Sequence, residues 1–178
     1  VLGCTLLGMT IEKVAYKPLR GSPRISLLIT AIGVSYFLEN AAQLVFGASA
    51  QSIPDIITLK AVQIGSIQIP GTAIITLVAA AASMIVLTLL VNHTRMGRAM
   101  RAVSEDTGAA QLMGVNISNT ISFTFALGSA LAGIGSVLYS CAYPQASPMM
   151  GSMLGLKAFV SAVLGGIGSI PGAMLGGL

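Results

Sequence analysis

Residues 95–116 read RMGRAMRAVSEDTGAAQLMGVN and form a charged segment between two apolar runs. The flanking runs, 72–91 and 120–139, carry no charge, and each has the length of about 20 residues that crosses a hydrocarbon core of about 30 Å. A chain this apolar has little need of a charged loop between two spans unless a partner outside the membrane binds it. The segment therefore predicts a membrane-embedded subunit that is moved by a separate soluble partner.

The composition of the whole chain also indicates a membrane protein. Charged residues make up 8% of the sequence and apolar residues 54%, whereas roughly 25% of an ordinary soluble domain is charged. A soluble chain of this length could bury one or two long apolar segments, but hardly the series found here. We therefore predict an all-α polytopic membrane protein whose residues 1–178 form one transmembrane domain. The spans are expected near 27–46, 72–91, 119–139 and 154–178.

The last of these runs and the two ends of the chain differ from the rest. Residues 158–178 are uncharged but are interrupted by glycines and by Pro171, so they predict either a broken span or a re-entrant pair. The sequence begins at Val1 in an apolar piece, residues 1–11, that is too short to cross a membrane by itself. It stops at Leu178 inside another apolar run. We expect an internal fragment of a longer membrane protein.

Two connections hold most of the basic residues, while the loop at 47–71 has only Lys60, offset by Asp55. Because positive residues are retained on the cytoplasmic side, both basic connections are predicted to be cytoplasmic. The net charge of +4 then reflects membrane orientation, and no nucleic acid partner is expected. The basic residues are Lys13, Lys17, Arg20 and Arg24 before the first full span, and Arg95, Arg98 and Arg101 in the loop at 92–118.

The two outer connections differ in pattern. Residues 62–69 alternate apolar and polar side chains, which predicts a short β-hairpin with Gly65 and Ser66 at its turn. Residues 140–152 contain Pro144 and Pro148 and are expected to hold only a turn or a short helix. Either connection could contact an external partner.

The loop at 92–118 contains signals for two short helices. Residues 97–104 read as a helical extension, which the acidic pair Glu105 and Asp106 interrupts. Asp106 or Thr107 can cap a second helix that runs to Met113 and ends at Gly114, because glycine adopts the left-handed conformation at little cost. Asn116 or Ser118 can then cap the next span.

The second of these helices has the character of a docking element. Ala109, Leu112 and Met113 share one face by helical spacing, and charged residues flank that face. A short apolar helix face outside the bilayer is typical of an element that docks into a groove of a partner. The alternative is a solvated interhelical loop, which would have no need of two capped helices. The predicted coupling residues are Arg98, Arg101, Glu105, Asp106, Ala109, Ala110, Leu112, Met113 and Gly114.

Candidates for the substrate pathway come from two places within the apolar runs. Glu39 is the only ionisable residue well inside a predicted span, next to Asn40, and a charge at that depth should face the bundle or a cavity. It could line the pathway or lie near the outer interface. Gly165, Gly166 and Gly168 mark the break in the last run, which could contribute backbone to a pathway.

The repeated glycines have a simpler alternative role, which is close helix packing. Gly168, Gly172 and Gly176 recur every four residues and predict one glycine face along a helix. The segment GGIGSIPG at 165–172 lacks the spacing of a dinucleotide loop, and no Gly-Lys-Ser/Thr follows it. Cys4, Cys141 and His93 have no metal-ligand spacing, so no metal site is expected.

Several stretches together resemble one transporter family. Residues 108–114, GAAQLMG, are similar to the EAA-type cytoplasmic loop (Glu-Ala-Ala-x-x-x-Gly) of ABC importer permeases, with Gly108 in place of the glutamate. Further stretches resemble the high-affinity branched-chain amino-acid permeases of the Leu/Ile/Val type, in order along nearly the whole chain. They are EKVAYKPLR at 12–20, MGRA at 96–99 with Arg101 and Ala102, KAF at 157–159 and GGIGSIPGA at 165–173.

This resemblance implies that the chain is a fragment of the transmembrane domain of an ATP-driven importer, with a short extracytoplasmic β-hairpin. The implied partners are a second permease subunit, expected to be a paralogue, two cytoplasmic ABC ATPases that use ATP-Mg, and a periplasmic protein that delivers Leu, Ile or Val. The family's coupling helix would correspond to residues 107–114. The chain itself has no phosphate-binding loop and is expected to bind no cofactor and to be no enzyme.

Three other classes of membrane protein fit less well. An ion-coupled secondary transporter would be expected to carry more intramembrane acids or histidines than Glu39 alone. A passive channel needs a selectivity constriction more than a docking loop, and a membrane enzyme needs a catalytic cluster within the spans. Within the importer class, other amino acids, amides or urea remain open as substrates.

Overall fold

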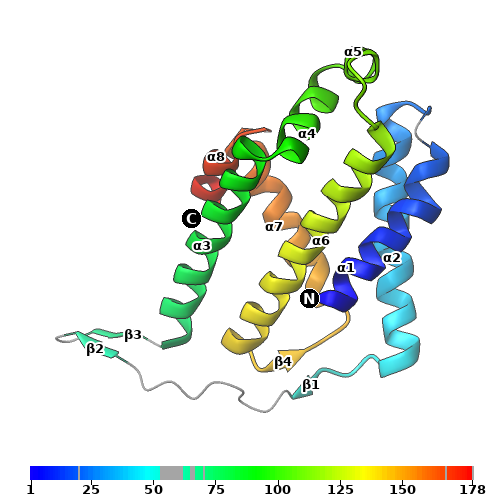
Figure 1. Ribbon diagram of the computed structural model, residues 1–178. Helices are drawn as coiled ribbons and strands as arrows, with labels where there is room; N and C mark the ends of the chain where they lie inside the picture. Colours follow the sequence, from blue (N-terminus) through cyan, green and yellow to red (C-terminus); the bar gives the residue numbers. More distant parts are fainter. Residues whose placement is uncertain (20, 53–61, 65–66, 70, 167, 178) are drawn as a thin grey trace. The chain divides into compact units, whose positions relative to one another are not determined.

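The computed structural model describes the chain except residues 20, 53–61, 65–66, 70, 167 and 178. Its longest elements are three helices: α2, Arg24–Phe46; α3, Gly71–His93; and α6, Ile117–Ala142 (Figure 1). All three contain stretches long and apolar enough to cross a membrane. These helices lie where the first three spans are predicted, and the protein is an all-α membrane protein with a few short strands.

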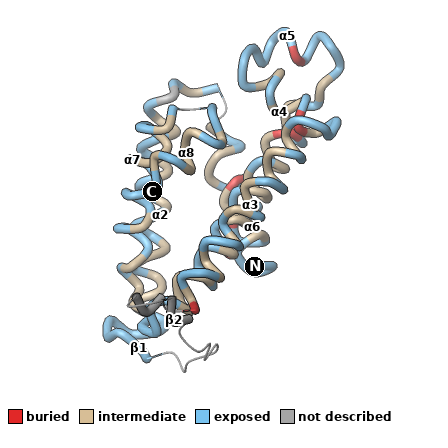
Figure 2. Tube along the Cα trace, turned by 90° about the vertical axis from the view of Figure 1, so that its left-hand side faces the viewer, coloured by how far each residue is buried: buried red, intermediate tan, exposed pale blue. Residues whose placement is uncertain are grey.

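Few side chains are buried (Figure 2). Among the described residues, Ala110 is the one buried apolar side chain, while large apolar groups along α2 and α3 are exposed. A soluble domain would enclose such groups in a core. Outward apolar surfaces on long helices are instead what a lipid environment or neighbouring transmembrane helices would cover.

The chain divides into two compact units, residues 1–34 with 85–137 and residues 35–84 with 138–178. The first unit contains the N-terminal helices and the charged loop. The second contains the strands and the last two helices. Every described basic residue of the two predicted cytoplasmic connections belongs to the first unit, as expected if these connections share one side of the membrane.

The apolar N-terminal piece is longer as a helix than the sequence suggests. Helix α1, Leu2–Ile11, continues into a π-helical turn, η1, Glu12–Tyr16, and a 3-10 turn, η2, Lys17–Leu19. The Lys17 amide donates to the Glu12 carbonyl, which closes the wider turn. Pro18 has no amide hydrogen to donate, so the chain cannot continue as a regular α-helix at that point.

This N-terminal helix packs along one face of α6 within the first unit. Gly8 is buried against Ser129, where a Cβ atom would overlap the serine side chain. Near the start of α1, a Cβ on Gly133 would lie 3.4 Å from the Cys4 sulfur. Small residues allow this close approach, which supplies packing contacts that lipid cannot provide by hydrophobic drive.

The second unit contains both pairs of strands. Strands β2, Val62–Ile64, and β3, Ile67–Ile69, pair antiparallel with Val62 opposite Ile69, which confirms the predicted hairpin. The predicted turn residues Gly65 and Ser66 lie outside the described residues. A second pair, β1, Gln51–Ser52, and β4, Gln145–Ala146, was not expected from the sequence.

The last apolar run is not one helix. Helix α7, Met150–Leu164, is followed by a turn and by α8, Ile170–Gly176, which packs back against α7. The run for which a broken span or a re-entrant pair is expected is therefore two helices, and the first of them begins before residue 154. The physical reason is that Gly166 and Gly168 have positive φ angles of 88° and 104°, which a helix cannot contain.

Candidate functional site

The charged loop begins with a firmly fixed helix, α4, Arg95–Glu105. The Thr94 hydroxyl oxygen accepts a hydrogen bond from the Gly97 amide at 3.0 Å and so caps the helix. Gly97 is buried against the end of α3, where a Cβ atom would overlap the carbonyl groups of Leu90 and Val91. The direction in which α4 leaves α3 is therefore set by a contact that only glycine permits.

The second short helix, α5, Thr107–Leu112, is capped by Asp106. One carboxylate oxygen of Asp106 accepts from the Gly108 amide at 2.8 Å and from the Ala109 amide at 3.1 Å. Asp106 has extended backbone angles, which end α4 and begin α5 at the same residue. Of the two predicted caps, Asp106 and Thr107, the structure therefore selects Asp106.

The far end of α5 is closed by glycine. Gly114 has a φ of 81°, its amide donates to the Gln111 carbonyl at 3.0 Å, and the Val115 amide donates to the Ala110 carbonyl at 3.0 Å. This pair of bonds is the Schellman arrangement. The Asn116 side chain then accepts from the Asn119 amide at 3.2 Å, so Asn116 and not Ser118 caps α6.

The outer surface of α5 is apolar. Leu112 is 91% exposed and Met113 is 84% exposed, and Ala109 is exposed beside them. Ala110 is only 3% exposed, so its side chain is not on the free surface with the other predicted coupling residues. The helix thus presents a small apolar face that nothing in the described chain covers.

The charged residues of the loop lie on α4 and at the residue that joins α4 to α5. Arg98, Arg101, Glu105 and Asp106 are all exposed. The Arg101 guanidinium donates to the side-chain oxygen of Asn92 at 3.5 Å, which ties α4 to the end of α3. An exposed apolar helix face with charges beside it can bind a groove of a partner that has complementary charge.

The predicted pathway residues belong to two different elements of the structure. Glu39 is half-buried on α2, and Asn40 is exposed and donates to the Tyr36 carbonyl of its own helix at 2.7 Å. Gly165, Gly166 and Gly168 belong to the turn between α7 and α8. In the described part of the chain, no hydrogen bond joins the two groups.

The turn between α7 and α8 is explained by packing. A Cβ atom on Gly165 would overlap the Gly172 carbonyl, and one on Gly176 would lie 2.5 Å from the Ser161 carbonyl oxygen. The Ser161 hydroxyl also donates to the Ala173 carbonyl at 2.7 Å. Two of the three repeated glycines thus face α7, whereas Gly168 lies in the turn, so the continuous glycine face predicted for one helix is wrong.

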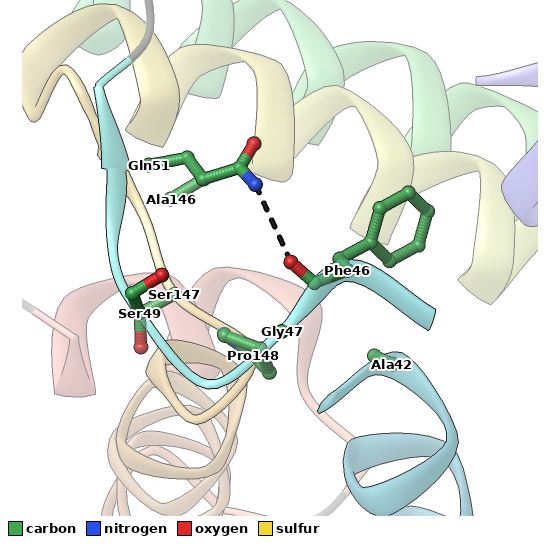
Figure 3. Close-up of a pocket in the computed structure, with 8 residues that line it drawn as sticks. All are labelled: Ala42, Phe46, Gly47, Ser49, Gln51, Ala146, Ser147 and Pro148. Carbon is green, nitrogen blue, oxygen red and sulfur yellow. Dashed lines mark hydrogen bonds between the residues drawn. The ribbon is translucent and has the colours of Figure 1, made fainter. Parts of the chain in front are cut away.

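A small cavity of about 240 Å³ lies in the second unit where the end of α2 approaches the paired strands β1 and β4 (Figure 3). The Gln51 amide donates to the Phe46 carbonyl at 3.3 Å across this site. The pairing of β1 and β4 gave no signal in the sequence, because two residues are too few to show an alternating pattern. The lining residues are Ala42, Phe46, Gly47, Ser49, Gln51, Ala146, Ser147 and Pro148.

A further polar residue was missed by the sequence analysis. Glu12 is only 3% exposed, and its carboxylate accepts from the Ser122 hydroxyl on α6 at 2.8 Å. An acidic residue at the border of an apolar stretch was the available signal. This signal does not reveal the burial of Glu12, because the apolar piece before it is too short to cross a membrane by itself and its packing partner is distant in sequence.

Comparison with known proteins agrees with the sequence pattern. Residues 1–178 match the family described as "Branched-chain amino acid transport system / permease component". The chain is 42% identical to the high-affinity branched-chain amino acid transport system permease protein BraD of Pseudomonas aeruginosa, over 100% of this chain and 59% of the relative. It is 43% identical to the corresponding protein LivH of Escherichia coli K12, over 96% of this chain and 57% of the relative.

A more distant relative is the xylose transport system permease protein XylH of Escherichia coli K12, 29% identical over 49% of this chain and 24% of the relative. No solved structure matches the chain. The chain spans a little under three fifths of the length of the nearer relatives described above. With its apolar spans and its match from end to end, the chain belongs to the branched-chain amino acid transport permease family.

Proposed function

We propose that this chain is part of the permease subunit of an ATP-driven importer of branched-chain amino acids in the cytoplasmic membrane of a bacterium. The observation that carries the proposal is α5, a helix capped at both ends that exposes Leu112 and Met113. The names of the nearer relatives support branched-chain amino acids as substrates. The charged loop would lie in the cytoplasm, because it carries the basic residues.

In the proposed mechanism, two cytoplasmic ATPases bind ATP-Mg and close, and each holds the α5 helix of a permease subunit in a groove. Closure moves α5, and the spans shift between outward-open and inward-open states. A second permease subunit, a paralogue of this one, completes the pathway, and a periplasmic binding protein delivers Leu, Ile or Val. Glu39, Asn40, Gly165, Gly166 and Gly168 are the residues of this chain that we propose for the substrate pathway.

Uptake by the reconstituted full-length transporter tests this function. The permease is purified with its ATPases and binding protein and placed in liposomes that contain ATP. Leucine uptake that requires ATP, and that xylose does not compete for, is the expected result. Leucine uptake that persists without the ATPases and follows a proton or sodium gradient would contradict the proposal.

The side of the membrane is tested separately. A cysteine introduced at Met113, whose side chain is 84% exposed, should react with a membrane-impermeant maleimide only after the cells are opened. The matched control is a cysteine at Ser49, which belongs to the predicted outer loop and should react in intact cells. Labelling of position 113 in intact cells would place the loop on the outer side and would contradict coupling to cytoplasmic ATPases.

A further inference from the structure

The buried carboxylate of Glu12 requires an explanation, because few side chains of this protein are buried at all. It is 3% exposed, and the Ser122 hydroxyl donates to it at 2.8 Å. Removing a carboxylate from water costs several kcal/mol unless hydrogen bonds or charges compensate for the lost hydration. An apolar residue would fill the same space without that cost, so a role beyond filling space is indicated.

The backbone around Glu12 is also unusual. Glu12 begins the π-helical turn η1, in which the Lys17 amide donates to the Glu12 carbonyl. Such turns are rare and occur frequently at functional sites. The same turn ends at Tyr16, which packs on Phe125 of α6 with ring centroids 4.9 Å apart. Glu12 and Tyr16 thus contact the same end of α6 from one turn of the N-terminal helix.

That end of α6 is directly connected to the coupling helix. The chain runs from Gly114, which closes α5, through Asn116, which caps α6 and is only six residues before Ser122. The hydrogen bonds of the first turns make this part of α6 rigid. Displacement of α5 would therefore be transmitted along the chain to Ser122 with little loss.

We propose that Glu12 is a positioning residue for transport, an inference that rests on the proposed function. The contact between the Glu12 carboxylate and the Ser122 hydroxyl, here called the Glu12–Ser122 link, joins the N-terminal helix to the start of α6. When the ATPases move α5, the link makes α1 and α6 move as one body. Without it, ATP hydrolysis continues, but α1 follows the movement of α6 less completely and transport falls.

The number of leucine molecules taken up per ATP hydrolysed measures this coupling directly. In the complete reconstituted transporter, Glu12→Ala and Ser122→Ala should each lower this ratio about tenfold. Adding Ser122→Ala to Glu12→Ala should lower the ratio little further, because the contact that Ser122→Ala removes is already absent. Ser122→Thr keeps the hydroxyl and should retain the wild-type ratio. Thr10→Ala is the matched control, since the exposed Thr10 hydroxyl donates only to the Leu6 carbonyl of its own helix at 2.8 Å.

Different results would overturn different parts of the argument. Unchanged ratios in the single variants, or losses that multiply in the double variant, would refute the link while leaving the proposed function in place. Absence of ATP-dependent uptake in the wild-type complex would refute the proposed function and the link with it.

A reversible cross-link separates a loss of coupling from a loss of folding. A Cβ atom at Gly133 would lie 3.2 Å from the Cβ atom of Cys4, within a few tenths of an ångström of the range of about 3.5–4.5 Å found in disulfides. In a Glu12→Ala, Gly133→Cys, Cys141→Ser variant, oxidation would join α1 to α6 covalently. Oxidation should restore the ratio of leucine to ATP, and reduction should lower it again. A ratio that stays low after complete oxidation would refute the proposal.

Discussion

The α4–α5 loop and the α7–α8 hairpin are both pairs of short helices, yet different chemistry fixes each pair. In the loop, side-chain oxygens of Thr94 and Asp106 bond to free backbone amides, and the outer face of α5 stays uncovered. In the hairpin, the backbone at Gly165 meets the backbone at Gly172 directly. Side-chain caps hold a helix in shape while leaving its surface available. Backbone contact fixes two helices against each other and leaves no room for an added atom.

The largest effect is expected in the hairpin. Gly165→Ala places a methyl group on the Gly172 carbonyl, and overpacking of this kind costs about 1–3 kcal/mol or more when neither backbone can yield. The amount of monodisperse full-length permease recovered in detergent should fall at least about fivefold. Gly155→Ala is the control on the same helix, because a Cβ atom there has no neighbour within 4 Å. Equal recovery of the two variants would show that the backbone contact is unimportant.

The next largest effect is expected at the uncovered face of α5. Leu112→Asp places a charge where we propose that an apolar groove binds, and the affinity for the ATPases should fall at least about tenfold, or 1.4 kcal/mol. Recovery of the permease should not change, since Leu112 is 91% exposed. Gln111→Asp adds the same charge to the opposite side of the helix and should bind nearly as the wild type does. Pull-down of the ATPases measures both, and equal loss in the two variants would contradict a docking face.

A smaller effect is expected at the end of the same helix. Gly114→Pro cannot adopt a φ of 81° and lacks the amide that donates to Gln111, so both features of the cap are lost. The fraction of ATPase retained by the permease should fall about fivefold as the end of α5 frays. Gly114→Asn should retain most of the binding, because asparagine tolerates the left-handed conformation. Undiminished binding and transport with proline would refute the role of this cap.

The smallest effect is expected at the start of α5. Asp106→Ala removes a cap worth about 1 kcal/mol, which corresponds to roughly fivefold faster amide exchange of a locally opening helix. Hydrogen exchange of a peptide containing Gly108 and Ala109 measures this change. Asp106→Asn keeps an accepting oxygen and should exchange at close to the wild-type rate. Faster exchange in both variants would mean that the charge, and not the cap, holds the helix.

The comparison also explains what could be predicted from the sequence. The first three spans and the ends of α5 can be predicted from short stretches of sequence. The length and hydropathy of a run predict a span, and capping residues act on backbone groups only a few residues away. The sequence does not distinguish Asp106 from Thr107 as the cap, because both residue types can cap a helix and the choice depends on which one has an extended backbone. The sequence therefore predicts two candidate residues for each cap, and the structure shows which of the two is the cap.

The hairpin and the N-terminal helix depended on partners distant in sequence. The spacing of Gly168, Gly172 and Gly176 suggested one helix face, but the positive φ of Gly168 ends any helix there. The buried carboxylate of Glu12 accepts a hydrogen bond from Ser122, 110 residues further along the chain. No pattern around either residue identifies the other. Contacts of this kind arise from tertiary packing, which a single sequence does not reveal.

The widened turn at Glu12–Tyr16 has a consequence for how permeases of this kind can diverge. In this turn an amide donates a hydrogen bond to the carbonyl five residues earlier, so the turn contains one residue more than an α-helical turn. One inserted residue can therefore be accommodated there without rotating the helix on either side. Gly8 can keep facing Ser129 whether or not the extra residue is present. Gain or loss of one residue between 12 and 16 is therefore the length change that this helix tolerates best. An alignment gap there would signal an altered Glu12 environment and not a different fold.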